Sequence, residues 1–173
     1  MTGSQGLPLA GVRVIEFTHM VMGPAAGLIL ADLGADVIKI EPVDGDSTRH
    51  LPGSGSGYFP MYNRNKRSLC VDLKSPDGLA AVQRLISKAD VLIENFRPGG
   101  LKRFGLDYDT VAAANERIVY ASISGFGTGA GAGYPGYDLM IQAISGLMSL
   151  TGDADGPPYR AGISVFDVMA GMH

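Results

Sequence analysis

Asp167 is the residue of this sequence with the clearest potential for chemistry. It lies in the segment GISVFDVMAGMH at residues 162–173. We expect Ala161–Val165 to form a short apolar strand and Asp167 to lie in the first turn of the helix that follows. The helix dipole favours a negative charge there by about 0.3–1 kcal/mol, so the side chain should be ionised at neutral pH and able to act as a nucleophile. Capping of the helix is the simpler alternative, because Asp is common in that role.

Three loops have the composition of ligand-binding segments. Thr18–Pro24 is expected between the end of the first strand and the next helix, where open α/β sheets bind ligands, although simple turn formation is an alternative. Pro42–Gly57 is too long for an ordinary crossover loop and indicates a mobile flap or binding loop, with plain disorder as the alternative. Gly125–Gly133 is rich in glycine, but it lacks the Lys-Ser or Lys-Thr of a phosphate-binding P-loop and is a weak signal.

The elements that would position these loops alternate between strands and helices. Short β-branched runs predict strands at Val12–Glu16, Asp36–Ile40, Ser68–Asp72, Asp90–Glu94 and Ile118–Ser122. Helical patterns are found at Pro24–Leu33, Ser75–Ala89, Pro98–Phe104, Tyr108–Ala114 and Asp138–Leu150. This order predicts an α/β fold with an open, mainly parallel sheet, helices on both faces and the first strand near the centre.

Composition limits the class of protein further. The 173 residues, 46% hydrophobic and 18% charged, suffice for one domain with one core. A net charge of −3 without a basic run argues against a nucleic-acid partner. No stretch resembles a membrane span and Met1–Gly6 does not resemble a secretory signal, so we expect a soluble, cytoplasmic protein with no membrane partner. The single cysteine, Cys70, excludes an internal disulfide and is expected to be a buried small hydrophobe.

Several motifs together resemble the class III CoA-transferases, a family that includes formyl-CoA and carnitine CoA-transferases and 2-methylacyl-CoA racemases. They are Gly11–Phe17, Leu33–Glu41, Asn65–Ser68, Glu94–Gly99 and the segment around Asp167, and the similarity runs from about Leu7 to the last residue. The resemblance implies an open Rossmann-like domain, of which residues 1–173 would be the N-terminal part, and a homodimer of interlocked chains. It also implies coenzyme A or an acyl-CoA as substrate, no metal, and Asp167 as the catalytic nucleophile.

The resemblance further implies which residues contact CoA. They follow the first strand (His19, Met20), follow the fourth strand (Asn95, Phe96, Arg97), lie on the next short helix (Arg103) or precede the long apolar helix (Tyr137). Arginine suits the phosphates of CoA because its planar guanidinium makes paired, charge-assisted hydrogen bonds. A solvated helix face for Arg103 and a turn-capping role for His19 stay open as alternatives.

Position 137 separates the two chemistries of the family. Racemases pair the aspartate with the histidine of a Gly-His-Asp motif, whereas this sequence reads Gly136-Tyr137-Asp138. A tyrosine, with a pKa of about 10, is a poor base at neutral pH but a good hydrogen-bond donor. We therefore expect CoA transfer from an acyl-CoA donor to a carboxylic acid acceptor through an aspartyl intermediate. Racemisation and a noncatalytic acyl-CoA-binding fragment are the alternatives, and we expect the 173-residue chain alone to be inactive because no cover excludes water from its nucleophile.

Overall fold

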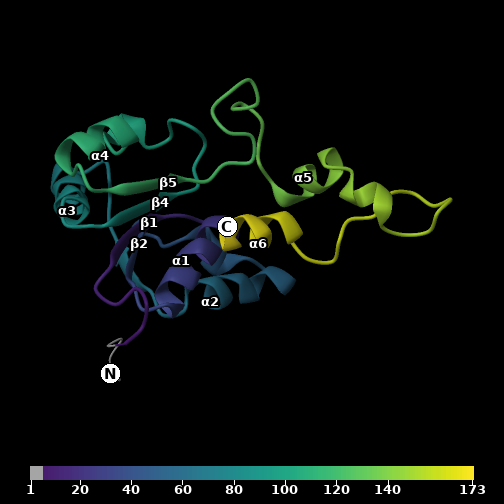
Figure 1. Cartoon of the computed structure of the whole chain (residues 1–173), viewed down its shortest axis with the longest axis horizontal. Helices are drawn as coiled ribbons and strands as arrows, with labels where there is room; N and C mark the ends of the chain where they lie inside the picture. Colours follow the sequence, from purple (N-terminus) through teal and green to yellow (C-terminus); the bar gives the residue numbers. More distant parts are fainter. Residues whose placement is uncertain (1–5) are drawn as a thin grey trace.

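The computed structural model describes residues 6–173 (Figure 1). Its centre is one sheet in the strand order β3-β2-β1-β4-β5, with every neighbouring pair parallel. The strands are β1 (Arg13–Phe17), β2 (Asp36–Glu41), β3 (Arg67–Cys70), β4 (Val91–Glu94) and β5 (Val119–Ser122). The predicted open parallel sheet and the central place of the first strand are confirmed, and the strand ends differ from the predicted ones by at most two residues.

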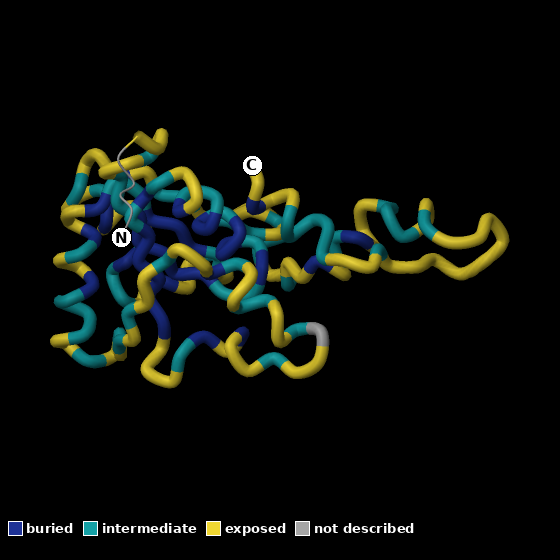
Figure 2. Tube along the Cα trace, turned by 90° about the horizontal axis from the view of Figure 1, so that it is seen from below, coloured by how far each residue is buried: buried dark blue, intermediate teal, exposed yellow. Residues whose placement is uncertain are grey.

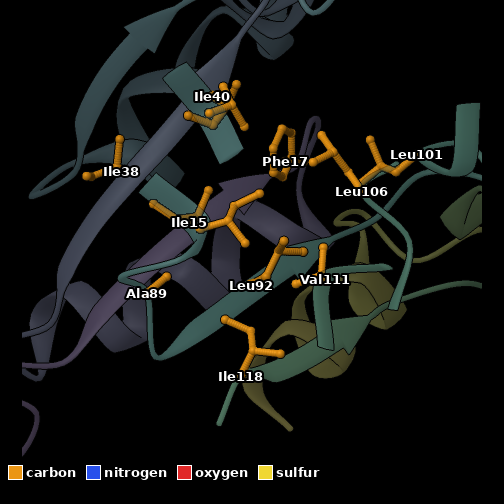
Figure 3. Packing of buried hydrophobic residues seen from close by; sticks show 12 residues of the cluster. Ile15, Phe17, Ile38, Ile40, Ala89, Leu92, Leu101, Leu106, Val111 and Ile118 are labelled. Atoms are coloured by element: carbon orange, nitrogen blue, oxygen red, sulfur yellow. The ribbon is translucent and has the colours of Figure 1, made fainter. Parts of the chain in front are cut away.

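One face of the sheet is covered by α3 (Pro76–Ile86) and α4 (Tyr108–Ala114). Ser75 caps α3 through its side chain and Pro76 occupies the first turn, as the Ser-Pro-Asp signal predicts. Val82 of α3 packs in one cluster with Ile15 and Leu92, and all three are completely buried. Figure 3 shows Ile15 and Leu92 within this cluster. This apolar layer fixes the positions of the central strands.

The opposite face is covered by α1 (Met22–Asp32). Because side chains alternate along a strand, Val14, Val37 and Ile93 point to this face and pack with Ala31 of the helix. Helices on both faces of the sheet are therefore confirmed (Figure 1).

Two more helices lie on the α1 side of the sheet, α2 (Tyr58–Asn63) and α6 (Val165–Met172) (Figure 1). The close approach of α6 to α1 depends on Gly171, where a Cβ atom would lie 2.6 Å from the Cβ of Ala25 and 2.6 Å from the carbonyl oxygen of Met22. The packing of α6 on α1 brings the end of the described chain back to the first helix.

Residues 124–164, which we call the arm, leave the sheet after β5 and project from it (Figure 2). The arm contains α5 (Asp138–Ile144) and a 3-10 helix, η4 (Leu147–Leu150). A single long helix over Asp138–Leu150 is therefore wrong. Gly146 lies between the two pieces with a φ of 83°, a left-handed conformation that a helix does not continue through.

The predicted strand at Ala161–Val165 is also wrong. This segment has no strand structure, and α6 begins at Val165. Its backbone groups bond to a side chain of α5 instead of a neighbouring strand, since Gln142 accepts from the N–H of Ala161 at 2.8 Å and donates to the carbonyl of Ile163 at 3.2 Å.

Three smaller expectations concern a short helix, the cysteine and the long loop after β2. Of the helical piece Pro98–Phe104 only η3 (Lys102–Phe104) is helical, and the residues before it form turns with Gly99 at a φ of 78°. Cys70 is exposed, not buried, because β3 is an edge strand. The segment Pro42–Gly57 contains two short 3-10 helices, η1 (Ser47–His50) and η2 (Gly53–Gly57), and its mobility stays a prediction.

Candidate functional site

The loops after β1 and β4 begin side by side at the centre of the sheet and lead the chain in opposite directions. From β1 the chain crosses to β2 on one side, whereas β4 lies on the other side, so the loops at the carboxyl ends of β1 and β4 flank a topological switch point. Asn95 joins them. Its side chain accepts from the N–H of His19 at 3.0 Å and donates to the carbonyl of His19 at 2.9 Å. Both the oxygen and the nitrogen of the Asn95 side-chain amide are used in this way, which holds the two loops in one arrangement.

A cleft of about 790 Å³ opens above this switch point. It is formed by the loops after β1, β2, β4 and β5 together with the start of α6. All eight residues that the sequence nominated for the site line this cleft: His19, Met20, Asn95, Phe96, Arg97, Arg103, Tyr137 and Asp167.

His19 lies in the wall of the cleft beside Phe96, with the two ring centroids 5.4 Å apart and the planes at 30°. Burial lowers the pKa of His19, so its imidazole is neutral at pH 7. Met20 follows with a φ of 63°, and its backbone N–H donates to the hydroxyl of Thr48 at 3.1 Å. The loop is therefore held from both sides, by Asn95 and by the segment after β2.

Two arginines supply positive charge to the cleft. Arg97 and Arg103 are both exposed, and the guanidinium of Arg103 lies 4.7 Å from the ring centre of Phe104. Within residues 6–173 neither guanidinium forms a salt bridge. Both are therefore available to an anionic ligand in the cleft.

Asp167 is the third residue of α6 and borders the cleft. Burial, together with the nearby carboxylate of Asp138, raises the pKa of Asp167 to about 6. The pKa is therefore raised although Asp167 lies in the first turn of a helix, because desolvation and a like charge outweigh any stabilisation of the anion by the helix dipole. A pKa of about 6 still leaves the side chain mostly ionised at neutral pH.

Asp138, and not Asp167, fills the capping role at α6. One carboxylate oxygen of Asp138 accepts from the backbone N–H groups of Phe166 at 2.8 Å and of Asp167 at 3.1 Å. Its other oxygen accepts from Gln142, which is completely buried. The backbone of Asp167 is positioned by this pair, while its own carboxylate is left out of the cap.

Asp138 and Gln142 were not predicted from the sequence as positioning residues. The signal was present, since two polar residues four positions apart share one face of an otherwise apolar helix. A buried ionic cluster below the cleft was not predicted either; it is formed by Glu16, Lys39, Asp46 and Lys66. The charged residues Glu16 and Lys39 within mainly apolar strands were the signal there.

Lys66 is the most perturbed base of the ionic cluster. Its ammonium lies 2.8 Å from a carboxylate oxygen of Glu16 and 2.8 Å from the carbonyl oxygen of Pro24. Burial lowers the pKa of Lys66 to about 8, against the opposing effect of the Glu16 charge. The cluster therefore lies in a poorly solvated environment.

None of the helices in residues 6–173 is long and apolar enough to cross a membrane. No group of three or more His, Cys, Asp or Glu side chains in this range is arranged to hold a metal ion.

A parallel sheet with a ligand-sized cleft at its switch point defines a Rossmann-like binding domain. Residues 9–173 match the model of CoA-transferase family III, and the chain belongs to this family. The resemblance drawn from its motifs is confirmed.

Individual relatives agree with this assignment. The chain is 46% identical to a succinate–glutarate CoA-transferase of Agrobacterium fabrum, over 96% of this chain and 44% of that protein. It is 46% identical to a formyl-CoA:oxalate CoA-transferase of Streptomyces coelicolor, over 95% of this chain and 41% of that protein. A crystal structure of a CAIB/BAIF family protein from Brucella suis superposes with a TM-score of 0.90 at 43% identity, covering 96% of this chain and 46% of that one. The chain thus spans less than half the length of these relatives.

Proposed function

We propose that this chain carries the CoA-binding loops and the nucleophile of an enzyme that transfers CoA from an acyl-CoA thioester to a carboxylic acid. The observation that carries the proposal is the position of Asp167, a carboxylate with a raised pKa, in the same cleft as the candidate CoA-binding residues. In this proposal residues 1–173 form the N-terminal part of the large domain of a homodimeric CoA-transferase.

The reaction begins with attack by the Asp167 carboxylate on the carbonyl carbon of the donor thioester. The C–S bond breaks, CoA leaves as a thiolate, and a mixed anhydride joins the acyl group to Asp167. The thiolate then attacks the aspartyl carbonyl carbon, which releases the donor acid as a carboxylate and leaves an aspartyl-CoA thioester.

The acceptor acid runs the same steps in reverse. Its carboxylate attacks the aspartyl thioester, CoA thiolate leaves again, and the thiolate attacks the acceptor carbonyl of the new anhydride. A new acyl-CoA is formed and Asp167 is regenerated as a carboxylate, so one thioester is consumed and one is made. Water must be kept from the anhydride, because hydrolysis would lose the thioester energy.

The raised pKa of Asp167 suits both halves of this exchange. A carboxylate with a pKa of about 6 is more basic than an ordinary aspartate and hence a better nucleophile, yet it remains mostly ionised at neutral pH. The burial and the Asp138 charge that raise the pKa also disfavour the free anion, which makes formation of the uncharged acyl-aspartate easier.

The walls of the cleft offer suitable contacts for CoA. In the proposal Arg97 and Arg103 bind phosphates, since both are exposed there, and His19, Met20, Asn95 and Phe96 line the path of the pantetheine chain. Tyr137, at the edge near Asp167, donates a hydrogen bond to CoA or the acyl group. The names of the relatives pair succinate with glutarate and formyl-CoA with oxalate, and we propose a small carboxylic acid of this kind as acceptor.

The test is Asp167→Asn in the complete protein, assayed with a panel of acyl-CoAs and acids by mass spectrometry. The amide keeps the size of the side chain but is not a nucleophile, so transfer should fall by about 10³-fold or more while CoA binding and folding persist. Asp153→Asn, an exposed position of the arm, is the matched control and should keep full activity. Near-normal transfer by Asp167→Asn would show that another group forms the intermediate.

A further inference from the structure

We infer that Lys39 is a positioning residue for the CoA site, because its ammonium joins the loop after β1 to the loop after β2 directly under the cleft. Lys39 itself is not among the residues that line the cleft. The inference rests on the proposed function, since the loop after β1, with His19 and Met20, is one that we propose to bind CoA.

Lys39 lies on the α1 face of the sheet, where the preceding residues of the neighbouring strands are apolar. Two residues earlier on each strand, Val14 pairs with Val37, and both are buried against α1. Toward the carboxyl end of the same strands the facing pair is Glu16 and Lys39, which are also buried, with 0% and 1% of the residue exposed. The apolar layer therefore changes to an ionic one where the strands reach the cleft.

The ammonium of Lys39 contacts both loops. It donates to the carbonyl oxygen of Thr18, the residue before His19, at 2.5 Å. It also lies 3.0 Å from a carboxylate oxygen of Asp46. Glu16 lies farther away, at 3.6 Å, and is paired more closely with Lys66 at 2.8 Å. The charge of Lys39 is thus directed mainly at the two loops.

From Asp46 a chain of hydrogen bonds leads back to the loop after β1, which contains His19 and Met20. The other oxygen of Asp46 accepts from both the N–H and the hydroxyl of Thr48, each at 2.8 Å. The Thr48 hydroxyl in turn accepts from the N–H of Met20 at 3.1 Å. Lys39 therefore holds this loop at two points, at Thr18 directly and at Met20 through Asp46 and Thr48.

Met20 is the place where such support is needed. It is one of two described non-glycine residues with a positive φ, and this left-handed conformation is unfavourable for a side chain with a Cβ atom. Strained residues of this kind persist only where their surroundings hold them. The bond from Met20 to Thr48 supplies that restraint and keeps His19 and Met20 in the wall of the cleft.

Stability alone is a weak explanation for this arrangement. Apolar residues often replace buried ion pairs at little or no cost, whereas buried ionic groups can select one conformation. The conformation that Lys39 selects is that of the loops after β1 and β2, which form two walls of the cleft. The structure therefore assigns Lys39, Asp46 and Thr48 to the positioning of the binding loop.

The experiment uses Thr48→Val and Thr48→Ser in the complete protein. Valine keeps the volume of the completely buried side chain and removes the hydroxyl, while serine keeps the hydroxyl. In Thr48→Val the hydroxyl's bonds to Met20 and to Asp46 are both lost, and the Met20 amide should exchange hydrogen faster. Both the Kd for CoA and the KM for acyl-CoA should rise about 3- to 10-fold, the size expected when the hydrogen bond that holds Met20 is lost, with kcat nearly unchanged. Thr48→Ser should restore wild-type values. Thr110→Val makes the same change on α4 and is the control. It removes a hydroxyl that bonds to Asp107 at 3.0 Å, and neither residue lines the cleft, so both constants should be unchanged.

Lys39→Met should show the same pattern with a larger rise in Kd. If this variant does not fold, Thr48→Val decides alone. A Thr48→Val protein with wild-type Kd and KM, whatever its melting temperature, would overturn the inference. CoA binding does not require turnover. Retention of transfer by Asp167→Asn would therefore count against the proposed function, and the effect of Thr48→Val on CoA binding could still be measured. Failure of the wild-type protein to bind CoA would overturn both.

Discussion

The sheet body, residues 6–123, and the arm, residues 124–164, hold their parts of the cleft by different means. In the sheet body two clusters of apolar side chains pack between strands and helices, and Figure 3 shows the larger one. In the arm the buried side chains are the polar Asp138 and Gln142, while large apolar residues such as Leu139, Ile144 and Leu150 are exposed. The sheet body thus depends on apolar packing, and the arm on a few hydrogen bonds.

This difference corresponds to a division of labour in the proposed reaction. The candidate CoA-binding residues His19, Asn95 and Arg97 follow strands of the sheet body. The start of α6, which carries the proposed nucleophile, is held by the arm residue Asp138. Changes in the body should therefore affect stability and CoA affinity, whereas changes in the arm should affect the nucleophile.

The largest effect is expected from Lys66→Met in the sheet body. The change leaves the completely buried Glu16 without its closest cation, and loss of one partner of a buried pair costs about 3–5 kcal/mol. Urea denaturation of the complete protein should show this fall in the free energy of unfolding. Lys88→Met removes an exposed lysine and is the control, with an expected change below about 0.5 kcal/mol. Equal effects for the two variants would contradict the importance of the ionic cluster.

Next in size is Arg103→Ala, which should weaken CoA binding by about 1.5–3 kcal/mol if a charge-assisted hydrogen bond to phosphate is lost. Calorimetry should show a smaller effect at high salt, because the arginine is exposed. The neighbouring Lys102→Ala is the matched control, since Lys102 does not line the cleft. Unchanged affinity in Arg103→Ala at low ionic strength would assign Arg103 to a solvated helix face.

The pH dependence of transfer reports on the arm. Because the pKa of Asp167 is raised to about 6, the nucleophilic carboxylate is lost as the pH falls through 6, and kcat/KM should drop about tenfold per pH unit below that value. A profile that stays flat down to about pH 4 would indicate an ordinary aspartate and contradict the effect of burial.

The smallest effect is expected from Asp138→Asn. The amide oxygen can still accept from the N–H groups of Phe166 and Asp167, but the negative charge is gone. Burial remains the main cause of the raised pKa of Asp167, so the midpoint of the profile should move down by only about half a unit to one unit. Asp138→Ala removes the cap as well and should lower the free energy of unfolding by about 1 kcal/mol. An unmoved midpoint in Asp138→Asn would show that the charge of Asp138 does not reach Asp167.

The sequence predicted the sheet body far better than the arm. Strands such as Val12–Glu16 and Asp36–Ile40 are rich in Val and Ile and are buried on both faces, so their composition indicates them. In the arm, Asp138–Leu150 has an apolar composition without a sheet to pack against, and a single glycine breaks the helix. Ala161–Val165 is apolar in the same way, but its backbone bonds to Gln142 and no strand forms.

The same contrast holds within the candidate site. Residue types and motifs brought His19, Asn95 and Asp167 into view, and the structure gathers them in one cleft. The pKa of Asp167 could not be predicted, because it depends on burial and on a carboxylate 29 positions away in sequence. The link from Lys39 to Met20 was hidden for the same reason, since it runs through the side chains of Asp46 and Thr48 in the loop after β2 to a backbone amide of the loop after β1.

Covalent trapping tests the central claim most directly. The complete protein would be incubated with an acyl-CoA, treated with hydroxylamine and digested, and the modified peptide would be identified by mass spectrometry. An ordinary carboxylate does not react with hydroxylamine, whereas an aspartyl anhydride or thioester does. We expect a hydroxamate on Asp167 that is absent from Asp167→Asn. A label on Glu41 or Asp138, or transfer without any label, would contradict the assignment of Asp167 as the nucleophile.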